Sequence, residues 1–228
     1  MAAFTDWFSQ LQWENLLDLL ISAASCIVCI VLHELCHGLA ALLMGDDTAR
    51  RSGRLTLNPL KHIDPVGLVL LFTVHFGWAK PVPVNYRRFK NPRFGMALTA
   101  LAGPLGNLLL SCIFASCYGV CAVWYQHSGL DAAYYLAVFF LTTVNLSIGL
   151  AIFNLIPIPP LDGSKILFSV LPHSWYARIL RYERYGMILR VAILYLGILD
   201  APLRILRSGI LNGILSVFGD PLARLLIG

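Results

Sequence analysis

The chain has 228 residues, of which 58% are hydrophobic and only 13% are charged, about half the charged share of a typical soluble domain. The mean hydropathy is +0.73. This composition excludes a water-soluble domain, which needs more polar surface, and a disordered chain, which needs fewer apolar residues. The formal net charge is +5, but the basic residues flank apolar runs instead of forming a stripe. We therefore expect a lipid bilayer around the protein and no nucleic-acid partner.

Three apolar segments, residues 16–44, 96–124 and 134–156, are long enough to cross a bilayer as helices. Gly45 ends the first segment, and a run of prolines ends the third. The six cysteines lie within the first two segments at spacings that favour packing over a disulfide framework. The sequence therefore predicts an all-α integral membrane protein with a three-helix transmembrane core.

A short element is expected between the first two core helices. Residues 66–78 are apolar but too few for a confident span. In residues 79–85, Pro81 and Pro83 forbid a helix and favour extended chain. Because unpaired backbone groups are costly in lipid, we predict a re-entrant or extended element that lies against the protein.

Two weaker apolar runs follow, at residues 187–199 and 203–218, with Asp200 and Pro202 breaking the pattern between them. They fit either a fourth span with an interfacial amphipathic helix or two surface helices. The predicted organisation is an N-terminal interfacial segment, an intramembrane core and a C-terminal helical, membrane-associated segment, at residues 1–15, 16–171 and 172–228.

Loop charges predict the orientation. Residues 45–95 carry nine Lys or Arg against three acidic residues, whereas residues 125–133 carry no Lys or Arg. The positive-inside rule then places the first of these loops in the cytoplasm and the amino terminus outside.

The first predicted span contains a possible metal motif, His33-Glu34-Leu35-Cys36-His37. Residues four apart share one face of a helix, so His33 and His37 can reach the same metal ion. Glu34 follows the first histidine and can act as a general base on a water molecule. The alternatives are a proton relay and a structural His–Glu cluster. Ionisable groups are costly within a span, and three in five positions favour a metal site over packing.

A catalytic zinc ion needs a third protein ligand and an open position. The candidate is Asp162, which follows the prolines after the third span and precedes Gly163, a residue suited to a tight turn. The alternative is that Asp162 is only the N-cap of the next helix. Topology favours the ligand, because His37 lies about 10 Å from the cytoplasmic end of the first span and Asp162 follows the same end of the third.

Two asparagines are further candidates for the site. Asn107, after Gly103 and Gly106 in the second span, lies at a similar depth and is assigned to catalysis or substrate binding; the glycines let another helix approach. Asn154 in the third span is the better candidate for polarising a carbonyl. We assign the remaining residues near these motifs to simpler roles. Cys36 is expected to pack within the helices, and His62 and His75 are expected at a surface or an interface.

These motifs together resemble the site-2 protease family of intramembrane zinc metalloproteases. The resemblance covers residues 31–167 and includes the segments 57–65 and 77–85, which look like a compact bacterial branch without PDZ or regulatory domains. It implies one Zn2+ per chain bound by His33, His37 and Asp162, with Glu34 activating the water and Asn154 assisting.

The resemblance also implies the substrate and the location. An unwound transmembrane substrate would pair with the extended edge at Val82, Val84 and Asn85. We expect a multi-pass protein of the bacterial inner membrane that hydrolyses peptide bonds of membrane proteins, with a homo-oligomer or a regulatory membrane partner left open. The alternatives are a His/Glu proton-relay transporter, which would bind no zinc, and a catalytically idle zinc-binding protein.

Overall fold

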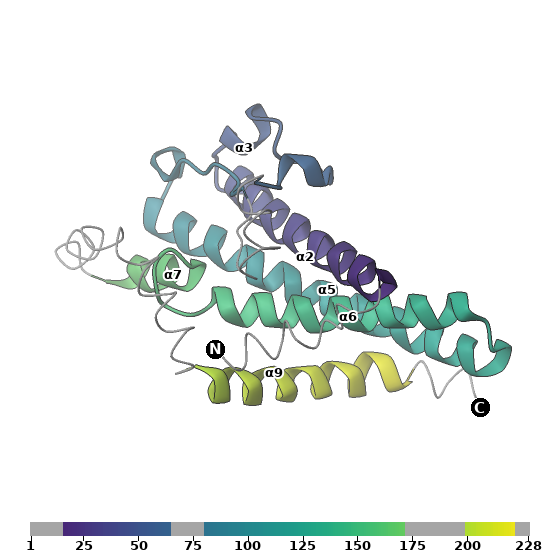
Figure 1. Ribbon diagram of the computed structural model, residues 1–228. Helices are drawn as coiled ribbons and strands as arrows, with labels where there is room; N and C mark the ends of the chain where they lie inside the picture. The colour runs from purple at the N-terminus through teal and green to yellow at the C-terminus, as the bar shows by residue number, and fades with distance from the viewer. Residues whose placement is uncertain (1–15, 65–79, 172–198, 222–228) are drawn as a thin grey trace. The chain divides into compact units, whose positions relative to one another are not determined.

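The computed structural model describes residues 16–64, 80–171 and 199–221, and every regular element in these ranges is a helix (Figure 1). The predicted interfacial segment at residues 1–15, the short apolar segment at 66–78 with His75, and most of the run at 187–199 lie outside them. The chain divides into two compact units. Unit 1 comprises Met1–Cys29, Asn107–Ile152 and Leu199–Gly228, and unit 2 comprises Ile30–Gly106 and Phe153–Ile198.

The three predicted spans are helices: α2 (Leu16–Leu43), α5 (Pro92–Ser128) and α6 (Asp131–Asn154). Each is long and apolar enough to cross a membrane, which confirms the all-α membrane fold. The helix α5 extends four residues beyond the predicted span at each end. A proline is tolerated in the first turn of a helix, and polar residues can continue a helix beyond the apolar stretch.

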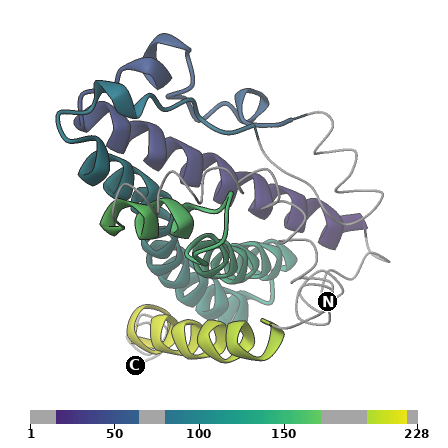
Figure 2. The same cartoon turned by 90° about the vertical axis from the view of Figure 1, so that its left-hand side faces the viewer.

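The core of unit 1 joins α5 and α6 to α9 (Asp200–Ile214), which a π-turn at Leu215–Gly219 extends. Ala115, Val144 and Ile148 are fully buried and form this core together with Ile152. The helix α9 lies alongside α5 and α6 (Figure 2). Its residues Leu203, Ile210, Leu211 and Ile214, with Leu215 of the π-turn, pack against this core. These positions recur at helical spacing, which explains the apolar run seen in the sequence.

The start of α9 differs from the sequence prediction. Asp200 and Pro202 were expected to interrupt the apolar pattern, but the helix begins at Asp200 and includes both. A proline in the first turn removes only an N–H group that has no partner within the helix. Among the described residues, α9 is not one of the three helices that are long and apolar enough to cross a membrane, and the two alternatives for this end of the chain stay predictions.

Hydroxyl groups cross-link the helices of unit 1. Thr143 Oγ1 donates a hydrogen bond to Ser25 Oγ at 2.9 Å, and Ser147 Oγ donates to the backbone carbonyl of Asn107 at 2.9 Å. All four residues are fully buried. Small polar side chains of this kind let apolar helices approach closely and still satisfy their hydroxyl groups.

Unit 2 carries the extended element predicted between the first two spans. Residues 80–85 contain no helix, in agreement with the prediction from the prolines, and the short helices α3 (Thr48–Arg51), η1 (Pro59–Lys61) and η2 (Tyr86–Arg88) lie along the chain on either side. The same unit contains α7 (Asp162–Val170).

Two buried charged residues hold the extended segment. The Arg54 guanidinium donates hydrogen bonds from Nη2 to the carbonyl oxygens of Lys80 and Pro81, at 2.5 and 3.1 Å. The Asp46 carboxylate accepts the backbone N–H of Asn85 at 2.5 Å. Both ends of the segment are therefore fixed to the polar loop that follows α2.

Candidate metal and catalytic centre

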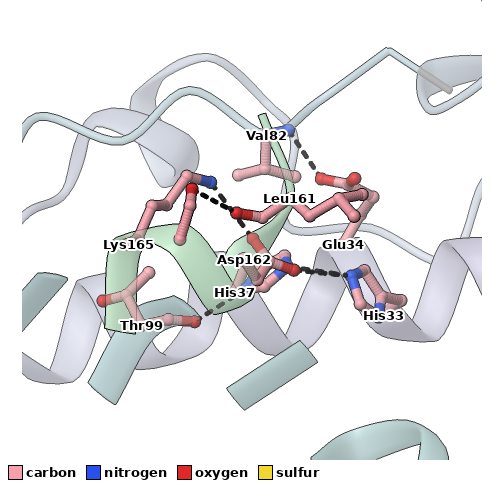
Figure 3. A network of polar contacts seen from close by, with 9 residues as sticks. His33, Glu34, His37, Val82, Thr99, Leu161, Asp162 and Lys165 are labelled. Carbon is pink, nitrogen blue, oxygen red and sulfur yellow. Dashed lines mark hydrogen bonds and ion pairs between the residues drawn. The ribbon is translucent and has the colours of Figure 1, made fainter. Parts of the chain in front are cut away.

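Three possible ligand atoms converge within unit 2. His33 and His37 come from α2, and Asp162 comes from the start of α7 (Figure 3). The Nε2 atoms of the two histidines lie 3.0 Å apart, and Asp162 Oδ2 lies 3.2 Å from His33 Nε2 and 3.0 Å from His37 Nε2. All three residues are buried. Among the described residues, this is the cluster with the composition of a metal site.

The donor set fits a zinc ion. His37 Nδ1 lies 2.7 Å from the carbonyl oxygen of Thr99; since that oxygen only accepts, Nδ1 carries the proton and Nε2 of the neutral ring offers a lone pair. Tetrahedral zinc with bonds of about 2.0–2.1 Å separates its ligands by about 3.3 Å, close to the separations here. A cation between these atoms would be held by His33, His37 and Asp162, each through one atom.

Asp162 begins α7 and is not its N-cap. The N-cap is Leu161, and it makes no side-chain capping hydrogen bond. The Asp162 carboxylate faces the histidines instead, so the capping alternative is wrong.

Glu34 lies beside the ligands and has one defined partner. Its Oε2 atom accepts a hydrogen bond from the backbone N–H of Val82 at 2.8 Å (Figure 3). Val82 is buried, whereas Glu34 is half-buried. One carboxylate oxygen is thus held by the extended segment of residues 80–85, and the other carries no protein hydrogen bond among the described residues.

Two glycines of α5 make room for the site. A Cβ atom on Gly103 would lie 2.5 Å from His37 Nε2 and 2.7 Å from His33 Cε1, and one on Gly106 would lie 2.3 Å from Cys36 Sγ. The predicted close helix approach is therefore confirmed, and at Gly103 the neighbour is the pair of imidazole rings. The contact at Gly106 also agrees with the packing role predicted for Cys36.

At two other positions, a glycine is needed because a Cβ atom would meet atoms other than the ligand rings. Gly163 was expected to permit a tight turn, but it has no positive φ; a Cβ there would lie 2.2 Å from the carbonyl oxygen of Leu155. Its function is to bring Asp162 close to the end of α6. Gly38 similarly leaves space on α2, because its Cβ would lie 2.5 Å from a methyl carbon of Leu55 and 3.2 Å from Val82 Cγ1.

The predicted asparagine roles stay predictions. Asn154 is half-buried and is the last residue of α6, in unit 2. Asn107 belongs to unit 1, where it is fully buried. Neither amide atom of its side chain has a hydrogen-bond partner in the part of the chain that the structure describes.

The residues predicted to bind a substrate strand differ in whether their backbone groups already have hydrogen-bond partners. The Val82 N–H is bound to Glu34, and the Asn85 N–H is bound to Asp46, while the Asn85 carbonyl accepts from the Arg88 N–H. Val84 makes no hydrogen bond among the described residues. Pairing of another strand with Asn85 would break these bonds, and the substrate role of Val82, Val84 and Asn85 stays a prediction.

Sequence reasoning misplaced His62 and missed three supporting residues. His62 was predicted at a surface or an interface. It is fully buried, with Nε2 2.9 Å from the Thr56 carbonyl oxygen, so it does not lie at the surface. Thr99, Arg54 and Lys165 were not singled out. The contacts of Thr99 and Arg54 involve backbone carbonyl groups, which every residue has, so the sequence could not reveal them. The spacing of Lys165 from Asp162 matches one helical turn and could have been used to predict their contact.

Comparison with known proteins decides the family. The profile of peptidase family M50 matches residues 123–197, which include Asn154 and Asp162. Over 168 residues, 71% of this chain, the sequence is 42% identical to the Bacillus subtilis protein named "Putative zinc metalloprotease YwhC" and covers 74% of it. The chain belongs to peptidase family M50. The resemblance to the site-2 proteases is therefore confirmed, and the M50 chain is a metalloprotease.

Other relatives are matched over a smaller share of their length. The chain is 28% identical over 176 residues, 75% of its length, to "Putative zinc metalloprotease Rip2" of Mycolicibacterium smegmatis, and covers 65% of that protein. It is 31% identical over 148 residues, 63% of its length, to the protein of the same name from Mycobacterium tuberculosis strain H37Rv, and covers 54% of it. No solved structure matches the chain. The M50 family is membrane-embedded, which agrees with the three long apolar helices.

Proposed function

We propose that this M50 peptidase is an intramembrane endopeptidase that cleaves transmembrane substrates at a single zinc site in a multi-pass protein of the bacterial inner membrane. The convergence of His33 and His37 with Asp162 carries the proposal. These groups come from one long apolar helix and from a helix more than a hundred residues later in the chain. Nothing about packing requires two imidazoles and a carboxylate to meet within 3.2 Å.

His33, His37 and Asp162 would hold the zinc ion. A bound zinc ion at such a site polarises a peptide carbonyl and lowers the pKa of water. Support comes from the proton on His37 Nδ1, which the Thr99 carbonyl fixes in place. This arrangement leaves Nε2 free to be a ligand, as a hydrogen bond from the other ring nitrogen does at other zinc sites.

Glu34 would act as the general base and then as the general acid. In this proposal it takes the proton of the attacking water and returns it to the leaving amine. The hydrogen bond from Val82 supports the role, because it orients the carboxylate without using both oxygens. Asn154, at the end of α6, is proposed to polarise the substrate carbonyl, and Asn107 to contribute to substrate binding or catalysis.

The substrate would lie along the extended segment of residues 80–85. A transmembrane helix must unwind before cleavage, because its peptide bonds are shielded and hydrogen-bonded. An unwound strand can add to an exposed edge, and Val84 offers a backbone N–H and carbonyl that have no partner among the described residues. In an extended chain, groups two residues apart point to the same side, so Val84 faces the side on which Val82 meets Glu34.

The test is the variant Glu34→Gln, purified in detergent beside wild type and Asp162→Asn. We expect Glu34→Gln to keep one zinc ion per chain and to lose cleavage by at least about 100-fold, whereas Asp162→Asn should lose both. Native membranes that contain Glu34→Gln should also accumulate bound substrates, which mass spectrometry identifies. Full activity of Glu34→Gln would refute the mechanism, and the absence of zinc from wild type would favour a proton relay.

A further inference from the structure

We propose that Lys165 is a positioning residue that keeps Asp162 a one-oxygen ligand and so preserves the open coordination position at the metal. The inference rests on the proposed zinc site. Lys165 lies three residues after Asp162 on α7, so both side chains leave the same face of the helix. Its ammonium Nζ lies 3.1 Å from Asp162 Oδ1 (Figure 3).

The two oxygens of Asp162 have separate partners. Oδ2 is the atom that approaches both histidine rings, at 3.2 and 3.0 Å, whereas Oδ1 is the atom that accepts from Lys165. A carboxylate can bind a metal through one oxygen or through both. The hydrogen bond from the ammonium group engages the second oxygen and so disfavours its use as a metal ligand.

The open position depends on this division. A catalytic zinc ion has three protein ligands and a fourth position for water or substrate. If both oxygens of Asp162 became ligands, the carboxylate would compete for that fourth position. Lys165 therefore favours the four-coordinate arrangement in which a water molecule can enter.

The surroundings of Asp162 and Lys165 favour a stable ion pair between them. The Asp162 side chain is 7% exposed, whereas that of Lys165 is 50% exposed, so the lysine spans the boundary between the buried ligand and solvent. A fully exposed ion pair is screened and weak, but here the carboxylate is shielded. The lysine approaches the carboxylate from the exposed side, and its ammonium contacts Asp162 Oδ1 there.

The test loads purified wild type, Lys165→Met and Lys165→Arg with Co2+, whose visible absorption distinguishes four-coordinate from five-coordinate sites. Lys90→Met, at an exposed position before α5, is the matched control. We expect Lys165→Met alone to shift toward the weaker five-coordinate absorption. Its zinc affinity, measured by competition with a chelator, should fall about 10–100-fold, as for other outer-shell partners, and Lys165→Arg should restore both.

The kinetic readout separates positioning from folding. Lys165→Met should lower kcat with little change in KM, and the thermal midpoint of the metal-free protein should equal that of wild type. A Co2+ spectrum of Lys165→Met identical to that of wild type would overturn the role of Lys165 and leave the ligand set intact. A wild-type chain that binds neither Co2+ nor Zn2+ would overturn the ligand set and this inference together.

Discussion

The carboxylate of Glu34 accepts the backbone N–H of Val82 across 48 residues of sequence, at 2.8 Å. The proposed general base and the segment proposed to present substrate are therefore joined by one hydrogen bond. Arg54 and Asp46 hold the same segment from the loop after α2. A substitution in that loop should consequently alter the position of Glu34 without altering a metal ligand.

Replacing Arg54 tests this connection. Arg54→Gln removes a buried guanidinium and leaves the carbonyl groups of Lys80 and Pro81 without their donor. We expect a loss of about 1–3 kcal/mol in the free energy of unfolding and a fall of about 10–100-fold in kcat/KM, with zinc content unchanged. Arg51→Gln, which breaks only an exposed ion pair with Asp47, should cost less than about 1 kcal/mol. Equal effects of the two variants would contradict the connection.

A methyl group on Gly103 should block the metal site. The added Cβ of Gly103→Ala would lie 2.5 Å from the ring of His37 and 2.7 Å from that of His33, so the rings must move. We expect the purified variant to contain well under one zinc ion per chain by atomic absorption. The control is Gly209→Ala on α9, where a Cβ meets nothing within 4 Å and alanine should stabilise the helix by about 0.5–1 kcal/mol. Full zinc in Gly103→Ala would show that the rings can shift at little cost.

Removing the metal should destabilise wild type but not a ligand variant. Zinc at about 100 times its dissociation constant stabilises a protein by about 2.7 kcal/mol when it binds only the folded state. Adding a chelator should therefore lower the thermal midpoint of wild type and leave that of Asp162→Ala unchanged. Asp131→Ala, at an exposed position at the start of α6, should respond as wild type does. A thermal midpoint of wild type that does not change when chelator is added would contradict the zinc site.

Asp46 should make stability depend on pH on the acid side. Burial raises the pKa of Asp46, but hydrogen bonds from Thr48 and Asn85 and the charge of Arg88 outweigh burial and lower the pKa below its usual value. The stabilisation is therefore fully present above the unfolded pKa of about 3.9 and is lost as the pH falls through the lower folded pKa.

The variant Asp46→Asn measures that contribution. At pH 7 it should be less stable than wild type by about 1–3 kcal/mol, and the difference should shrink as the pH falls below about 4. Thermal unfolding of both proteins without metal keeps zinc release out of the comparison. A difference that stays constant from pH 7 to pH 3 would show that ionisation of Asp46 does not matter.

The sequence was sufficient for the features that have a pattern of their own. The lengths of the apolar runs gave the three helices, and the four-residue spacing of His33 and His37 placed both rings on one face. Asp162 could be assigned only through topology, since an aspartate before a helix is equally typical of an N-cap. The structure removes that ambiguity because the helix starts at Asp162 itself and the carboxylate faces the histidines.

Other features could not be predicted because their partners are backbone atoms. Arg54 was counted only as a topology marker, yet it binds two carbonyl groups 26 and 27 residues away. Thr99 orients His37 through its carbonyl oxygen, a group that every residue has. His62 was expected at a surface or an interface, but a carbonyl acceptor allows it to be buried.

The separation of 129 residues between His33 and Asp162 has a consequence for biosynthesis. A ribosome releases the two histidines long before it has made the aspartate, so the growing chain has an incomplete ligand set while its first two long helices enter the bilayer. Proteolytic competence arises only after α6 and the turn that follows it have been translated. The proposed ligand set can therefore be completed only late in translation, after most of the chain has been made.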